Sequence, residues 1–184
     1  MKTTTTRTST TPKLLRILAL LFVAAALTAT ALSQTAADTA PQTEAQKAFA
    51  VIKNMPGTWD GKTADGHAVE VTFKVVSGGS AVLSEIQGHG PEDMISMFHL
   101  DGPNKLLMTH YCGAGNQPRM QAGVSPDGKT FTFTFFDGTN IAPDAGHMQK
   151  MVLTLLDDNH HTEEWIFASH GGEMKQFFDL RRKM

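Results

Sequence analysis

The feature that most restricts the fold is an alternation of apolar and polar side chains that starts near Val69 and recurs in short segments down to Arg181. In residues 69–75, valine and phenylalanine alternate with charged or hydroxyl side chains, as in a strand with one face in water. Glycine-, proline- and aspartate-rich turns separate such segments, at residues 77–80, 101–104, 125–128 and 157–159. Parallel strands need long crossovers, so the pattern predicts an antiparallel meander of about ten strands.

A meander of this length has two exposed edges unless it closes on itself. We therefore predict an all-β fold, a closed antiparallel up-and-down barrel, and keep a two-sheet sandwich as the alternative. One short helix is expected before the first strand, because residues 44–54 carry apolar side chains at helical spacing. Thr43 is a suitable cap for this helix, and Pro56-Gly57 end it.

The N-terminal segment has the composition of a secretory signal peptide. Four basic residues precede the apolar run 17–27, and small residues follow it at 29–33. The run is shorter than the roughly 20 residues of a spanning helix, although an uncleaved anchor remains the alternative. We predict a signal peptide over 1–33, a disordered linker over 34–43 and the barrel domain over 44–184. The mature protein is then exported, periplasmic or secreted, and free of the membrane.

Removal of residues 1–33 leaves 12 basic and 18 acidic residues, a net charge of −6. Nucleic acids and anionic membranes bind clustered Lys and Arg, so neither is an expected partner. Cys112 is the only cysteine, which rules out an internal disulfide. Stability has to come from burial and strand pairing.

A Gly57-Thr58-Trp59 segment after a short helix, with Arg181-Arg182 near the chain end, resembles the calycin superfamily. That superfamily contains lipocalins, fatty-acid-binding proteins and nitrobindin-like barrels. The resemblance implies that the Trp59 indole packs beneath a basic side chain of the last strand and closes one end of the barrel. We nominate Arg181 for this contact, with Arg182 as the alternative.

Four further segments, 97–102, 109–112, 115–120 and 161–165, resemble an uncharacterised family of exported bacterial proteins. The resemblance covers nearly the whole mature chain and supports a barrel. It implies no catalytic residues.

Residues 97–120 hold the densest group of candidate ligands. If 101–104 forms the hairpin loop, residue 100 faces residue 105, and His99 shares a face with His110 and Cys112. Two imidazoles and a thiol suit a soft transition metal or haem, although polar side chains packed inside the barrel explain them equally well. The nitrobindin-like barrels hold haem through a histidine near the end of the barrel, and the last strand here has none. The cofactor therefore stays unknown, with haem as an alternative.

Arg119 begins a strand at a barrel end and is a candidate carboxylate clamp beside Tyr111 or His110. The alternative is a structural ion pair, for which the candidate partners are Glu85, Asp93 and Glu163. Glu163 shares a face with Trp165 and is expected to point inward, where it needs a partner or a proton.

The leading functional prediction is a barrel that binds a small amphipathic molecule in its interior, between Met and Phe side chains and a polar head group site. The predicted ligand-binding residues are His99, His110, Tyr111, Cys112, Arg119 and Glu163. The alternatives are a haem or metal protein using His99, His110 and Cys112, or a solid-cored protein that acts through its surface. Catalysis by Cys112 is not favoured, because nothing marks an oxyanion hole. The oligomeric state stays open.

Overall fold

The structure is a computed structural model that describes residues 41–88, 93–142 and 145–184. The predicted signal peptide and nearly all of the linker lie outside these residues. Residues Gln42–Met184 form one compact unit. No helix among the described residues is long and apolar enough to cross a membrane.

The described chain contains helix α2 (Glu44–Ile52), a short 3-10 turn η1 (Ser77–Gly79) and ten strands. The strands are β1 (Gly57–Thr63), β2 (Ala68–Val76), β3 (Ala81–Gln87), β4 (Met94–Leu100), β5 (Leu106–Tyr111), β6 (Gln117–Val124), β7 (Thr130–Thr139), β8 (His147–Asp157), β9 (His160–Ser169) and β10 (Gly172–Arg182).

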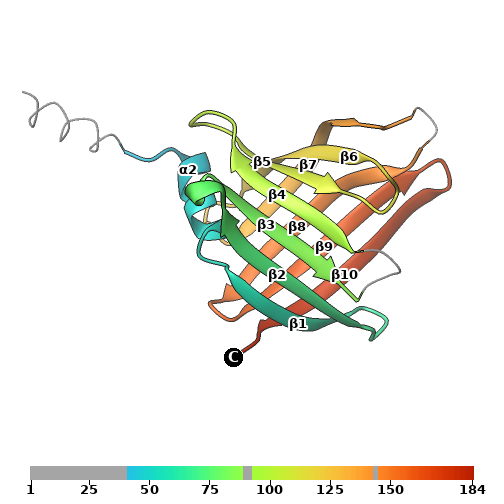
Figure 1. Cartoon of the computed structure of the whole chain (residues 1–184), viewed down its shortest axis with the longest axis horizontal. Helices are drawn as coiled ribbons and strands as arrows, with labels where there is room; N and C mark the ends of the chain where they lie inside the picture. Colours follow the sequence, from blue (N-terminus) through green and yellow to red (C-terminus); the bar gives the residue numbers. More distant parts are fainter. Residues whose placement is uncertain (1–40, 89–92, 143–144) are drawn as a thin grey trace, which may run out of the picture. The chain divides into compact units, whose positions relative to one another are not determined.

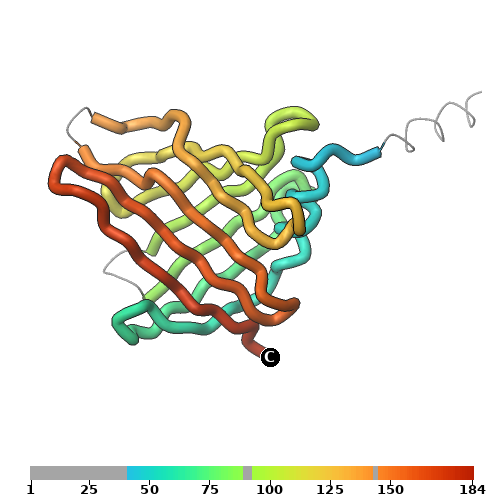
Figure 2. Tube along the Cα trace, turned by 180° about the vertical axis from the view of Figure 1, so that it is seen from behind, coloured from blue at the N-terminus to red at the C-terminus, as the bar shows by residue number. Residues whose placement is uncertain are grey.

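Each strand pairs with its neighbour in sequence, and β1 pairs with β10 to close the barrel (Figures 1 and 2). All pairings are antiparallel. The predicted closed antiparallel barrel is therefore confirmed, and the sandwich alternative is wrong. Closure leaves Trp59 directly opposite Arg182 and Gly61 opposite Leu180.

Helix α2 lies at one end of the barrel (Figure 1). It begins as predicted at Thr43, whose hydroxyl accepts a hydrogen bond from the Gln46 backbone, while the Gln46 side chain accepts one from the Thr43 backbone. Such a capping arrangement is worth about 1 kcal/mol. The helix buries Phe49 and Ile52 against the barrel core, so this end is closed.

The closed end is fixed by a contact between the first and last strands. The Trp59 indole N–H donates to the Met55 carbonyl oxygen at 3.0 Å, and the Arg182 guanidinium carbon lies 4.1 Å from the Trp59 ring centroid. Arg182 also donates to the Pro56 carbonyl oxygen at 2.7 Å. The nomination of Arg181 was wrong, because adjacent strand residues face opposite sides and Arg181 is exposed.

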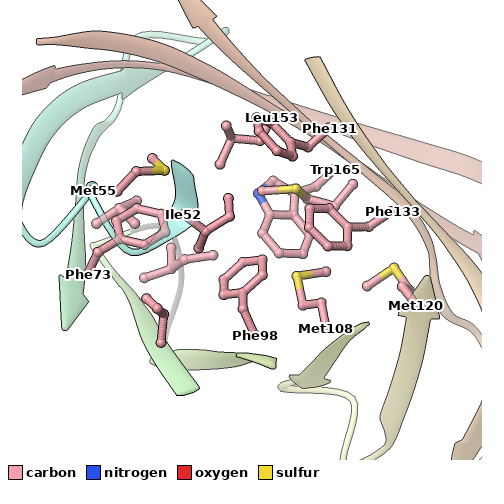
Figure 3. Close-up of a cluster of buried hydrophobic side chains, with 14 of the residues drawn as sticks. Ile52, Met55, Phe73, Phe98, Met108, Met120, Phe131, Phe133, Leu153 and Trp165 are labelled. Atoms are coloured by element: carbon pink, nitrogen blue, oxygen red, sulfur yellow. The ribbon is translucent and has the colours of Figure 1, made fainter. Parts of the chain in front are cut away.

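The interior next to the closed end is packed with side chains. Ile52 from the helix, Phe98, Met108 and Phe133 lie around Trp165 (Figure 3). The inward-facing core residues of the strands are almost completely inaccessible to solvent. This half of the barrel therefore leaves little free volume for a ligand of any size.

Candidate functional site

A chain of buried polar side chains crosses this apolar interior. On β9, alternation directs His161, Glu163 and Trp165 inward. The Trp165 indole N–H donates to one Glu163 carboxylate oxygen at 2.9 Å, and His161 Nε2 lies 3.3 Å from the other. The prediction that Glu163 points inward is confirmed.

The Glu163 side chain is only 1% exposed, and its ion-pair partner among the described residues is His161. A buried carboxylate is costly unless it is paired or neutral. His161 is therefore the group that can balance its charge. The His161 ring also packs edge-on against Trp59, 4.4 Å between centroids, which links the polar chain to the closed end.

His110 forms the second part of the polar chain. Its Nδ1 lies 2.9 Å from the Ser96 hydroxyl, and its ring centroid lies 4.9 Å from that of Trp165. Burial lowers the pKa of His110 to about 4, so the imidazole is neutral near pH 7. Its Nε2 has no hydrogen-bond partner among the described residues. A fully buried nitrogen of this kind can be satisfied by an ordered water molecule.

Ser96 was missed in the sequence analysis, although a signal for it existed. It lies on the inward face of β4, two residues before Phe98, and it faces His110 on β5. A correct β4–β5 register identifies it directly.

The predicted register of this hairpin was wrong by one residue. The Asp101 N–H donates to the Lys105 carbonyl oxygen at 2.9 Å, so the loop includes Lys105 and Leu100 faces Leu106. A shift of one residue moves His99 to the outer face, away from His110.

With that shift, His99 no longer lies on the same face as His110 and Cys112. The metal alternative that required all three side chains on one face is therefore wrong. No group of three or more His, Cys, Asp or Glu side chains in the described residues is arranged to hold a metal ion. Cys112 is half-buried beyond the end of β5. His110 already contacts Ser96, so the described contacts give the Cys112 thiol no activating base.

Haem does not fit the arrangement of side chains around His110. An iron atom needs direct access to Nε2, but His110 is completely buried and packs against Trp165. A porphyrin would have to displace the core. We derive no chemistry through haem.

Arg119 and Tyr111 lie on the outer surface, and their nomination as interior ligand-binding residues was wrong. Arg119 faces Asp137 on β7, donates from Nε at 2.6 Å and forms a second contact through Nη2. Its ion-pair partner is thus Asp137. The predicted partners Glu85, Asp93 and Glu163 were wrong. Tyr111 is 51% exposed. The alternation of both strands directs these side chains to solvent.

The barrel end opposite α2 differs from the closed end. Several of its inward positions are half-buried or exposed, and we call these the mouth: Met94, Phe135, Phe167, Met174 and Gln176. Their cross-strand neighbours Ile86 and Met148 are buried. Met174 is 61% exposed, because β1 ends at Thr63 and β10 continues past it. The mouth is thus the part of the barrel interior that solvent reaches.

Asn116 connects two loops near the mouth. Its side-chain amide donates to the Gly146 carbonyl oxygen at 2.9 Å, and its own side-chain oxygen has no partner among the described residues. Gly146 has to be glycine, because an added Cβ would lie 2.4 Å from the Phe167 ring. The loop before β8 therefore lies directly on a side chain of the mouth.

A groove of about 430 Å³ lies on the outside, between α2 and the β6–β7 hairpin. Its charged side chains are exposed and already paired, Lys47 with Glu44 and Asp127 with Ser125. Four buried side-chain atoms have no hydrogen-bond partner among the described residues: His110 Nε2, Asn116 Oδ1, His147 Nδ1 and His161 Nδ1. His161 lies beside Trp59 at the closed end, and the other three lie in the half of the barrel away from α2. The candidate site is accordingly the mouth.

The sequence matches no protein-family profile, and no curated protein matches it. The crystal structure of Rv2717c from M. tuberculosis is similar over 78% of this chain and 100% of that chain, with a TM-score of 0.55 and 13% identity. A de novo designed fluorescence-activating β-barrel matches 72% of this chain and 97% of the design at a TM-score of 0.29 and 14% identity. The first likeness extends to the fold alone, and the second is too distant to support an argument.

This fold is consistent with the expected calycin-like barrel, while a specific family is not established. A closed β-barrel of this kind can bind a ligand in its interior. Which part of the interior is free, and for what chemistry, depends on the side chains described above.

Proposed function

We propose that this protein binds a small, uncharged amphipathic molecule at the mouth of the barrel and not in its deep interior. The proposal rests on one contrast. Trp59 and Phe131, inward side chains near α2, are fully buried, whereas the inward side chains Met174 and Gln176 at the other end are exposed.

The mouth offers apolar contacts for the body of such a ligand. Met94, Phe135, Phe167 and Met174 are flexible or aromatic side chains on four different strands. Methionine adapts its shape to irregular apolar partners, and aromatic rings supply large contact areas. Phe135 and Phe167 also pack on the core, so one side of the site is held rigidly.

The polar groups nearest the mouth favour an uncharged head group. His110 is fully buried and neutral near pH 7, so it supplies no positive charge there. The Asn116 side-chain oxygen offers an acceptor. Among the described residues, alternation places no Lys or Arg on the inward face at this end, since Lys175 and Arg119 face outward. A carboxylate would have no cation to pair with there.

The proposal includes export. Its support is the basic, then apolar, then small-residue order of residues 1–33. Intact mass measurement of the protein from its own host tests this, since cleavage near residue 33 shortens the chain, whereas an uncleaved leader contradicts export by this route.

Binding is tested with N-phenyl-1-naphthylamine, an uncharged apolar probe whose emission rises on leaving water. We expect saturable binding to the wild-type protein, together with a change in the tryptophan emission of Trp165, which lies beside His110. Gln176→Trp fills the mouth from an exposed inward position and should weaken binding at least tenfold.

Tyr111→Ala and Arg119→Ala are matched controls on the outer face of neighbouring strands. Both should bind the probe like the wild type. Equal binding by the Gln176→Trp variant would contradict the mouth as the site, and absence of saturable binding to the wild type would contradict the function. Native mass spectrometry of protein from its own host then gives the mass of a retained ligand.

A further inference from the structure

The barrel carries an open strand edge beside the mouth. β1 pairs with β10 only from Phe178 to Arg182, because β1 ends at Thr63. Residues 172–177 of β10 pair with β9 on one side. On the other side, no strand in the described parts of the chain pairs with them.

The direction of the free backbone groups follows from two hydrogen bonds. The Lys183 N–H donates to Thr58 on the β1 side, while the Arg182 N–H donates to Asn159 on the β9 side. These directions alternate along a strand, so the odd-numbered residues point their N–H and C=O groups toward β1. Glu173, Lys175 and Phe177 therefore present their backbone groups at the open edge.

The same edge carries exposed apolar side chains. Met174 is 61% exposed on the inward face, and Phe177 is 40% exposed on the outward face. Edges that stay unpaired are protected by charges, bulges or covering segments. Here the edge carries Lys175, but Glu173 lies two residues before it on the same face. The edge therefore presents one positive and one negative charge to a pairing strand.

We propose that this edge is a dimer interface, in which β10 pairs antiparallel with β10 of a second copy around a two-fold axis at Met174. Residues with free backbone groups must face each other, so the axis passes through a residue of this stretch. An axis at Gln176 would place Met174 of the second copy opposite Phe178, where Thr63 already pairs, which leaves axes at Glu173, Met174 and Lys175. An axis at Glu173 places two glutamates opposite each other, and an axis at Lys175 places two lysines opposite each other. The axis at Met174 places Glu173 opposite Lys175 of the second copy, twice.

Opposite charges directly across an antiparallel pair stabilise it, and like charges destabilise it. The charge pattern Glu173-Met174-Lys175 is thus self-complementary in one register. That register also places the two Met174 side chains in a non-hydrogen-bonded pair, where Cα atoms are about 4.5 Å apart and side chains are closest. The exposed methionines then cover each other.

The first test is a charge swap, read by analytical ultracentrifugation of the full-length chain over a range of concentrations. The wild-type protein should be a dimer. Glu173→Lys and Lys175→Glu each convert both cross-strand pairs to like charges, and each should raise the dimer dissociation constant about tenfold. The double variant E173K/K175E restores both pairs with reversed signs and should dimerise within about threefold of the wild type.

The second test reads the register by disulfide formation in a Cys112→Ser background. Met174→Cys should cross-link two copies rapidly, because the predicted Cα separation lies in the disulfide range. Lys175→Cys should not cross-link, since it faces Glu173 of the second copy. Circular dichroism and the melting temperature verify that each variant is folded.

A wild-type monomer at all concentrations overturns the proposal and leaves the edge to a different partner or to none. The proposal is also overturned if neither single charge reversal weakens the dimer, or if the double variant does not restore dimerisation. Cross-linking through residue 175 and not 174 shows a different register and has the same consequence.

Discussion

The guanidinium of Arg182 lies over the indole of Trp59, 4.1 Å from the ring centroid, and joins the last strand of the barrel to the first. Arg182 also donates to the Pro56 carbonyl oxygen beside α2. One side chain therefore holds the helix end, β1 and β10 together at the closed end.

Arg182→Ala should lower the free energy of unfolding by about 2 kcal/mol, because it removes a partly buried cation–π contact and a charged hydrogen bond. Urea denaturation measures the loss. Arg181→Ala is the matched control and should change stability by less than about 0.5 kcal/mol, since Arg181 is exposed. Equal effects would contradict the assignment.

Glu163→Ala should lower the free energy of unfolding by about 3 kcal/mol, because it leaves the Trp165 N–H and His161 Nε2 buried without their acceptor. Glu163→Gln keeps an acceptor oxygen and should cost less. Glu164→Ala on the opposite face of β9 serves as the control. Chemical denaturation of the three variants gives the ranking, and a Glu164→Ala loss equal to that of Glu163→Ala contradicts it.

Stability should fall as the pH drops below about 6.5, in part because of His110. Its folded-state pKa is about 4, below the usual 6.5. Between these values the unfolded state binds a proton that the folded state does not, which costs about 3 kcal/mol across the window. His110→Gln removes this proton-binding difference. The free energy of unfolding of the variant, measured from pH 7 to 4, should fall less steeply than that of the wild type, and parallel curves would contradict the prediction.

Gly61→Val should prevent closure of the barrel. An added Cβ at Gly61 would lie 1.9 Å from the Asp179 carbonyl oxygen across the β1–β10 pair. The strands would have to separate, at a cost of several kcal/mol (roughly 3 or more). Gly123→Ala is the control, because a Cβ there meets nothing closer than 3.9 Å. The melting temperatures of both variants test the prediction, and a Gly61→Val variant as stable as Gly123→Ala would contradict it.

Arg119→Ala should leave stability almost unchanged, because its pair with Asp137 is exposed to solvent. Thermal unfolding measures this, and high salt should reduce the difference further. A large loss would mean that the outward pair has a structural role beyond the contact with Asp137 and the Phe136 ring.

The sequence by itself determined the class of fold and the alternation of faces within each strand. The period of two fixed which side of β9 carries Glu163, and the turn residues separated the strands, because both depend on neighbours in the chain. The capped helix followed in the same way. These features depend on residues close together in the sequence, so they could be predicted without knowing which strands pair.

Only the tertiary structure decided how the strands are registered against one another and what their side chains meet. Inclusion of Lys105 in one loop moved His99 out of the barrel and brought Ser96 to His110. The choice of Arg182 over Arg181, and the outward pair of Arg119 with Asp137, depend on the same cross-strand alignment. A one-residue shift costs little locally but reverses every face, and packing of the whole core selects the register.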